Sequence, residues 1–200
     1  MSNQIETQID VSLTERNRLT AFFRIILVVP AFFFVASCSP TSAFSDDAMS
    51  IYAGLLALPA ALAIIVRQVY PSYVLAFNDA LLSLQTRVDA YLLLLTDEYP
   101  SIEANQKVRL IYPEIEGGKK LSPWMPLVKW FLAIPLFLLG IIYVIYALVL
   151  TLIAWISVVK KGIYPEDKAE EVVKVIAYWN RLYGYSLLLV TDEYPSFSLN

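Results

Sequence analysis

Thr-Asp-Glu-Tyr-Pro-Ser occurs twice in this chain of 200 residues, at residues 96–101 and again at residues 191–196. An internal repeat is sought first, because overlooking one leads to the wrong fold. Other positions upstream of the two strings correspond in the same order: Arg87 with Arg181, Tyr91 with Tyr185, Tyr70-Pro71 with Tyr164-Pro165, Arg24 with Lys129, and Pro30 with Pro135. The sequence therefore predicts a tandem duplication, with the first repeat at residues 1–103 and the second at residues 104–200.

The composition is typical of a membrane protein. Of all residues, 58% are hydrophobic and 16% are charged, whereas about 25% are charged in soluble domains. Uncharged runs cover residues 25–45, 48–66 and 130–159, and about 20 apolar residues suffice to span a bilayer. A single helix over the third run would be roughly 45 Å long, too long for a hydrocarbon core about 30 Å thick unless strongly tilted.

The repeat therefore predicts a helical hairpin in each half. The first hairpin is expected at about residues 20–66, with the polar stretch 37–50 at its tip. The second is expected at about residues 124–159, turning between about Gly140 and Tyr146. Its arms are short, so either they span the bilayer or the hairpin is re-entrant. Two hairpins amount to four membrane helices.

The charges predict how the chain lies across the membrane. All 15 lysines and arginines fall outside the uncharged runs of the predicted hairpins, and the tips carry only Asp46 and Asp47. Basic segments stay in the cytoplasm, so we expect a multi-pass inner-membrane protein with both termini cytoplasmic and a basic rim facing anionic lipid. Cys38 ends a tetrapeptide like a lipoprotein cleavage site, but cleavage there would remove half a repeat.

Amphipathic helices are expected after each Tyr-Pro pair, at about residues 72–88 and 166–183, where apolar residues recur every three or four positions. Four segments have the composition of strands: residues 5–13, 91–96, 107–112 and 185–191. The predicted fold class is therefore membrane α+β. Each repeat would contain a strand, a transmembrane helical hairpin, an amphipathic helix and a strand, and the strands would form a small cytoplasmic sheet.

These motifs resemble an uncharacterised bacterial membrane family, domain of unknown function 4389. The resemblance rests on the basic residue six positions before a proline, the Tyr-Pro pair, the arginine before a small residue and tyrosine, and the Thr-Asp-x-Tyr-Pro string. It covers nearly the whole chain, once per half, and the long polar first tip departs from it. The resemblance implies membrane residence and no established activity.

The candidate site residues are the acids of the two strings and the arginines before them. Four carboxylates could surround a hard cation if the halves pack together: Asp97, Glu98, Asp192 and Glu193. The alternative is a turn in which each aspartate accepts backbone N–H bonds and ends a strand. Arg87 and Arg181 could hold a lipid phosphate, or make an intramolecular salt bridge or cap.

Several classes of function lose support. The chain has no histidine, which removes the Ser-His-Asp triad and the common zinc sites, and we expect no cofactor. Residues 117–120 lack the spacing of a phosphate-binding loop. The chain also lacks the compact basic domain that would favour binding to nucleic acid. The uncharged membrane runs disfavour an ion path.

The leading hypothesis is a non-enzymatic accessory or scaffold subunit of a larger membrane complex, which contacts other integral membrane proteins. The alternative is a small transporter, channel or lipid-handling protein with its path between the repeats. A third class is a membrane hydrolase that uses serine or carboxylate without histidine.

Overall fold

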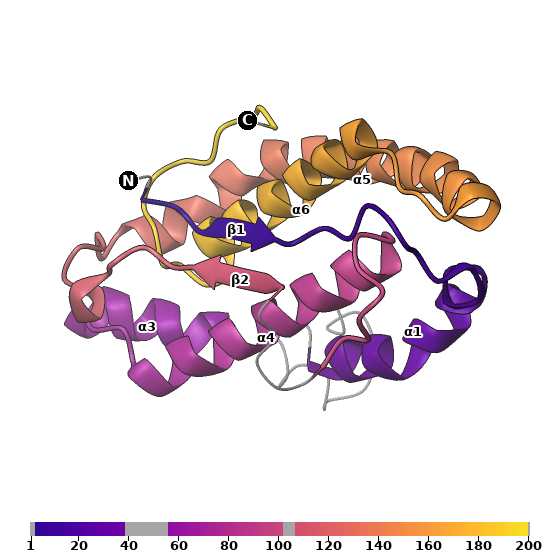
Figure 1. Cartoon of the computed structure of the whole chain (residues 1–200). Helices are drawn as coiled ribbons and strands as arrows, with labels where there is room; N and C mark the ends of the chain where they lie inside the picture. The colour runs from indigo at the N-terminus through magenta and orange to yellow at the C-terminus, as the bar shows by residue number, and fades with distance from the viewer. Residues whose placement is uncertain (1–2, 39–55, 102–106, 200) are drawn as a thin grey trace, which may run out of the picture.

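The computed structural model describes residues 3–38, 56–101 and 107–199. These residues form five α-helices, two strands and a short 3₁₀ turn, in the order β1 (Glu6–Ile9), α1 (Arg18–Cys38), α3 (Ala57–Arg67), α4 (Ser72–Leu92), β2 (Val108–Ile111), η2 (Glu116–Gly118), α5 (Met125–Lys161) and α6 (Glu166–Ser186). Helices α5 and α6 form one layer, and α1, α3 and α4 form the other (Figure 1). The two strands lie between these layers.

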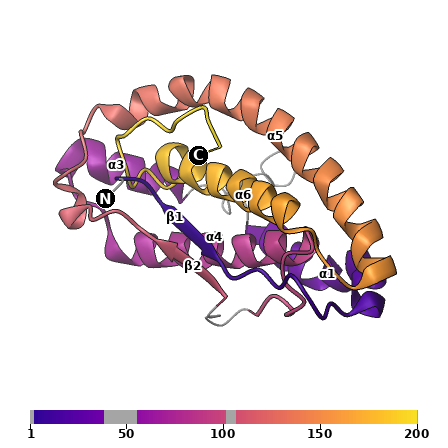
Figure 2. The same cartoon turned by 45° about the horizontal axis from the view of Figure 1, so that its top comes forward.

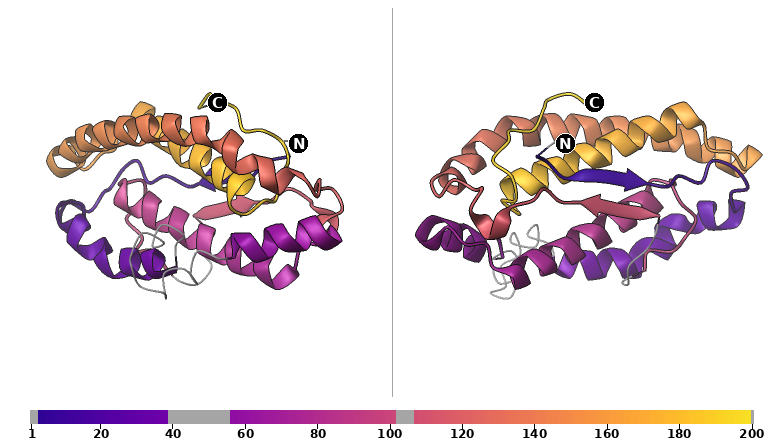
Figure 3. Two further views of the ribbon diagram at one scale, coloured as in Figure 1. Left: turned by 180° about the vertical axis from the view of Figure 1, so that it is seen from behind. Right: turned by 60° about the vertical axis from the view of Figure 1, so that its left-hand side comes forward.

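The two strands form an antiparallel ribbon in which Glu6 lies opposite Ile111 and Ile9 lies opposite Val108. β1 contacts α6 and β2 contacts α4, so the ribbon ties one helical layer to the other. Both views in Figure 3 show it at the seam between them. The chain ends also meet, because the backbone N–H of Asn3 donates to the carboxylate of Glu193 at 3.2 Å.

Helices α4 and α6 both begin directly after a Tyr-Pro pair, where the proline is the N-cap with φ of −65° and −64°. That value is fixed by the proline ring. Each preceding tyrosine is buried and reaches beyond the end of the opposite helix. The hydroxyl of Tyr70 donates to the carbonyl of Leu188 at 2.7 Å, and that of Tyr164 donates to the carbonyl of Leu93 at 3.4 Å. The start of each helix is thereby joined to the end of the other.

Helix α5 is continuous over 37 residues, so the prediction of a second hairpin is wrong. The region 140–146, where a turn was expected, lies inside the helix. Gly140 serves close packing, because a Cβ there would lie 2.8 Å from the Trp179 ring. The helix ends only at Gly162, whose φ is 73°. Helix α5 arches over α6 (Figure 2), as long helices do when they wrap a core.

The predicted strands at residues 91–96 and 185–191 are also wrong. Helix α4 runs to Leu92 and α6 to Ser186, and the chain then turns through Leu94 and Leu189, with φ of 64° and 58°. Both leucine side chains are buried, so packing holds a backbone conformation that leucine rarely adopts. Only the predicted strands at residues 5–13 and 107–112 contain strands in the structure.

The predicted fold class is therefore corrected. The described chain is mostly helical with one two-stranded sheet. The second half has one long helix where the described part of the first half has α1 and α3, so the described residues show neither a tandem repeat nor four membrane helices. The predicted first tip, with Asp46 and Asp47, lies outside the described residues.

Within the described ranges, two helices are long and apolar enough to cross a membrane: Arg18–Ala36 and Met125–Lys161. Helix α3 is shorter, at 11 residues. Large apolar side chains are exposed along α1, α3 and α5, and Phe131 is 73% exposed. Exposed apolar surface of this extent marks contact with lipid or with another protein.

Candidate functional site

The first string places Asp97 between two buried arginines. The carboxylate oxygen Oδ1 lies 2.5 Å from the guanidinium of Arg24 and 2.9 Å from that of Arg16. The arginine side chains are 2% and 0% exposed, and the aspartate side chain is 26% exposed. The other oxygen, Oδ2, accepts the backbone N–H of Asn17 at 2.9 Å. One carboxylate therefore joins the turn after α4 to the beginning of α1.

The guanidinium of Arg24 also donates to two backbone carbonyls, of Tyr91 at 2.8 Å and of Thr96 at 2.7 Å. It lies 4.3 Å from the centre of the Tyr91 ring, a cation–π arrangement. Arg16 donates to the carbonyl of Leu94 at 2.6 Å. Burial lowers the pKa of Arg16, while the nearby charge of Asp97 opposes that change. Both arginines thus hold the turn in which Leu94 has positive φ.

The second string has the same arrangement with one lysine. The Nζ of Lys129 lies 2.6 Å from Oδ1 of Asp192 and donates to the carbonyl of Thr191 at 2.7 Å. The backbone N–H of Ser122 donates to Oδ2 of Asp192 at 2.6 Å. The ring of Tyr185 lies under the ammonium, at 5.4 Å. The buried cations of α1 and α5 are therefore both neutralised by the aspartate of a string.

The other residues of each string complete the turn. The backbone N–H of Glu98 donates to the hydroxyl of Thr96 at 3.2 Å, and the second string repeats this bond between Glu193 and Thr191 at 3.1 Å. The tyrosines Tyr99 and Tyr194 pack edge to face on the rings that lie under the cations, with centroid distances of 5.7 Å and 5.6 Å. The threonine, aspartate and tyrosine of each string therefore all make structural contacts.

The structure does not bring the four candidate metal carboxylates together. The carboxylate of Glu98 is exposed and lies 3.5 Å from Lys107, and Glu193 contacts Asn3 at the N-terminal end. Among residues 3–38, 56–101 and 107–199, no three His, Cys, Asp or Glu residues are placed to hold a metal ion. Each aspartate instead faces its own buried cation.

The two arginines proposed for lipid phosphate donate to backbone carbonyls at the end of the first string and just after the second. Arg87 donates to the carbonyl of Ser101 at 2.8 Å, and Arg181 donates to that of Ser198 at 3.3 Å. Burial lowers the pKa of both guanidinium groups. These contacts are intramolecular hydrogen bonds to backbone carbonyls, and contact with a lipid phosphate stays a prediction.

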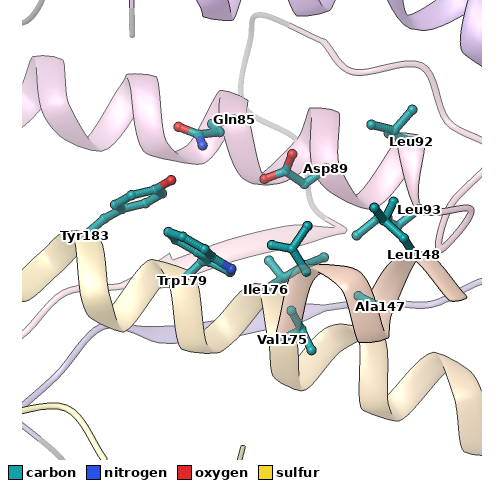
Figure 4. Close-up of a pocket in the computed structure, with 11 residues that line it drawn as sticks. Gln85, Asp89, Leu92, Leu93, Ala147, Leu148, Val175, Ile176, Trp179 and Tyr183 are labelled. Atoms are coloured by element: carbon teal, nitrogen blue, oxygen red, sulfur yellow. The ribbon is translucent and has the colours of Figure 1, made fainter. Parts of the chain in front are cut away.

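A pocket of about 350 Å³ lies between α4, α5 and α6. Its polar lining consists of Gln85 and Asp89 of α4, which face Tyr183 and Trp179 of α6 (Figure 4). The rest is apolar and comes from all three helices: Leu92, Leu93, Val144, Ala147, Leu148, Val175 and Ile176. Burial raises the pKa of Asp89 to about 7 and that of Tyr183 to about 12.

Sequence reasoning missed this pocket, although the sequence carries a signal for it. Gln85 and Asp89 are four positions apart on one helix, and so are Trp179 and Tyr183 on another. Residues at this spacing share a helical face. Each helix therefore has one polar or amphipathic pair on a face that is otherwise apolar, which is the signal for a pocket. The role of Arg16 was missed as well, because it has no counterpart in the second half.

No protein-family model, curated protein or solved structure matches this chain.

Proposed function

We propose that this protein is a non-enzymatic, multi-pass inner-membrane protein that serves as an accessory or scaffold subunit of a larger membrane complex. Its partners are other integral membrane proteins, with anionic lipid at the cytoplasmic face, where both termini lie. The resemblance to domain of unknown function 4389 agrees with membrane residence and adds no activity.

The observation that carries this proposal is the exposed face of α5. Three exposed apolar side chains on this face are spaced seven residues apart: Leu138, Ile145 and Leu152. No charged residue occurs between residues 130 and 159. Of the three charged side chains on this helix, Lys129 is buried against Asp192, and Lys160 and Lys161 lie in the last turn. An uncharged stripe at this spacing suits lipid and the helices of another membrane protein.

Site-directed photocrosslinking in native membranes tests the proposal. A photoreactive residue is placed singly at Leu138, Ile145 or Leu152, and at Ala147 or Ala154 as buried controls. We expect the exposed positions to crosslink to one integral membrane protein that also co-purifies in fixed stoichiometry after gentle extraction. Adducts with lipid alone, together with a partnerless protein after extraction, would contradict the scaffold function.

A small transporter, channel or lipid-handling protein is the second candidate. The pocket between α4, α5 and α6 favours it, because that pocket lies between the first and second halves of the chain and contains an acidic group. Flux of a substrate through liposomes that contain only this protein would support the second candidate over the first.

A further inference from the structure

The pocket between α4, α5 and α6 has a polar end and an apolar end, unlike an ordinary packing gap. Asp89 and Gln85 project from α4 toward Trp179 and Tyr183 of α6 (Figure 4). A volume of about 350 Å³ lies near the lower limit of pockets that bind small molecules. It therefore suits a small charged group with a ring or a short chain attached.

Asp89 differs from the aspartates of the two strings, because no cation within the described residues neutralises its charge. Asp97 and Asp192 each face a buried cation. Within the described residues Asp89 forms no ion pair and accepts no side-chain hydrogen bond, and burial is the cause of its altered pKa. A carboxylate in apolar surroundings gains most from a ligand of opposite charge.

The aromatic side of the pocket suits the same kind of ligand. The Trp179 side chain faces the pocket beside Asp89, and tryptophan offers the best aromatic face for a cation. The indole Nε1–H is buried and has no hydrogen-bond acceptor among the described residues, so a polar group on a ligand could also accept from it. Tyr183 is the other titratable side chain in the lining.

The pocket borders the apolar outer surface of α5. Val144 and Leu148 line it and are 38% and 53% exposed. A ligand can therefore reach Asp89 from the apolar side, provided that it carries an apolar part. A fully polar cation has nothing to bury along Leu92, Leu148 and Val175.

We propose that this pocket binds an amphiphilic ammonium compound. Its cationic nitrogen pairs with the carboxylate of Asp89 against the ring of Trp179, and its apolar part lies along the leucine and valine side chains of α4, α5 and α6. The shared chemistry is the alkylammonium group, whether it comes from a free hydrophobic amine or from the headgroup of a lipid. This inference does not depend on the scaffold function.

Calorimetric titration of the full-length protein in a neutral maltoside detergent tests the proposal. The probe is benzyltrimethylammonium, and its control is the uncharged isostere neopentylbenzene. We expect saturable binding of the cation, at least tenfold tighter than that of the isostere. Binding should also weaken as the pH falls from 8 to 6, because protonation removes the charge of Asp89. Equal affinity for both probes would overturn the proposal without any variant.

Variants locate the site. Asp89→Asn should weaken binding of the cation at least tenfold, and Asp89→Glu should retain it. The matched control Glu170→Gln removes an exposed acid on α6 and should leave binding unchanged. Circular dichroism establishes that each variant is folded. Where Asp89→Asn fails to fold, Trp179→Leu serves in its place, and unchanged binding in a folded variant of either kind counts against the site.

The source of the ammonium is decided with short-chain lipids. Dihexanoyl phosphatidylethanolamine is compared with dihexanoyl phosphatidylglycerol, which lacks the ammonium. Binding of the first lipid that is lost in Asp89→Asn assigns the site to a lipid headgroup. Binding of benzyltrimethylammonium alone assigns it to a free amine. Tighter binding of the phosphatidylglycerol than of the phosphatidylethanolamine would contradict the proposal.

Discussion

The buried cations Arg24 and Lys129 each hold the turn after a helix, through the aspartate and a backbone carbonyl of a string. Each carries a charge into a largely apolar helix, and a partly exposed aspartate neutralises it, at 2.5 Å for Arg24 and 2.6 Å for Lys129. Removal of one partner from a buried pair is far more harmful than removal of both, because the remaining charge has no compensation. The aspartates of the two strings are therefore structural, whereas Glu98 forms only an exposed pair with Lys107.

Replacement of neighbouring acids within one string tests this distinction. Asp97→Asn leaves Arg16 and Arg24 buried without a counter-charge, so we expect the free energy of unfolding to fall by roughly 3 kcal/mol, near the lower limit for buried pairs since Asp97 is partly exposed. Glu98→Gln removes the same charge from an exposed pair, so it should change the free energy of unfolding by less than about 1 kcal/mol. Reversible unfolding in mixed detergent measures both, and equal effects would refute the assignment.

The pKa of Asp89 makes a separate prediction about pH. Its value of about 7 lies above the ordinary 3.8, so between these two values the folded state holds a proton that the unfolded state has lost. The stability that Asp89 contributes is complete below pH 4 and is lost as the pH rises to about 7. Asp89→Asn should therefore be more stable than the wild type at pH 8, by on the order of a few kcal/mol.

Thermal unfolding at pH 5 and at pH 8 measures this effect. The difference between Asp89→Asn and wild type should be larger at pH 8 than at pH 5, and Glu170→Gln should show no such change. A variant that is less stable than wild type at both pH values would mean that the Asp89 carboxylate has a counter-charge in the folded protein.

The sequence identified Asp97 and Asp192 as a corresponding pair but not their cations. Arg24 lies 73 positions before Asp97, and pairing over that distance depends on how the helices pack. The arginines nearer in sequence, Arg87 and Arg181, reach backbone carbonyls instead. The sequence showed that the two strings correspond, because the same residues recur in both. It could not show which cation pairs with each aspartate, because that pairing depends on the fold.

At the level of elements, the starts of the helices were easier to predict than their ends. Tyr-Pro marks the starts of α4 and α6, because proline fixes the first turn. The ends were misread as strands, since runs of leucine favour either structure. The hairpin at residues 124–159 was inferred by analogy with the first half, although the run contains no pair of turn residues. Tertiary packing of Gly140 against Trp179 favours one uninterrupted helix.

A distance measurement tests the continuity of α5. Spin labels at the exposed positions Leu127 and Ile156 should lie about 40 Å apart, because 29 residues of helix extend by roughly 44 Å before curvature is considered. A hairpin that turns at residues 140–146 would place the labels within about 20 Å of each other. Double electron–electron resonance in bilayers measures this distance, and a population below 20 Å would restore the hairpin.

At the scale of the whole molecule, α1 and α5 expose apolar side chains while buried ion pairs tie their N-terminal parts to the turns that follow α4 and α6. The same arrangement that neutralises Arg24 and Lys129 leaves the outer faces uncharged. The composition alone predicted that the protein resides in a membrane, because this prediction requires only the balance of apolar and charged residues. It could not predict the number of spans, which depends on where each helix ends.

Depth measurements on α5 test membrane residence most directly. A nitroxide at Ile145, which is exposed and apolar, is compared in liposomes with one at the exposed polar position Glu170 of α6. Dissolved oxygen concentrates in the bilayer, whereas a nickel chelate stays in water. We predict that the label at Ile145 collides often with oxygen and rarely with nickel, and that the label at Glu170 does the reverse. Equal access of nickel to both labels would contradict the placement of this protein in a membrane.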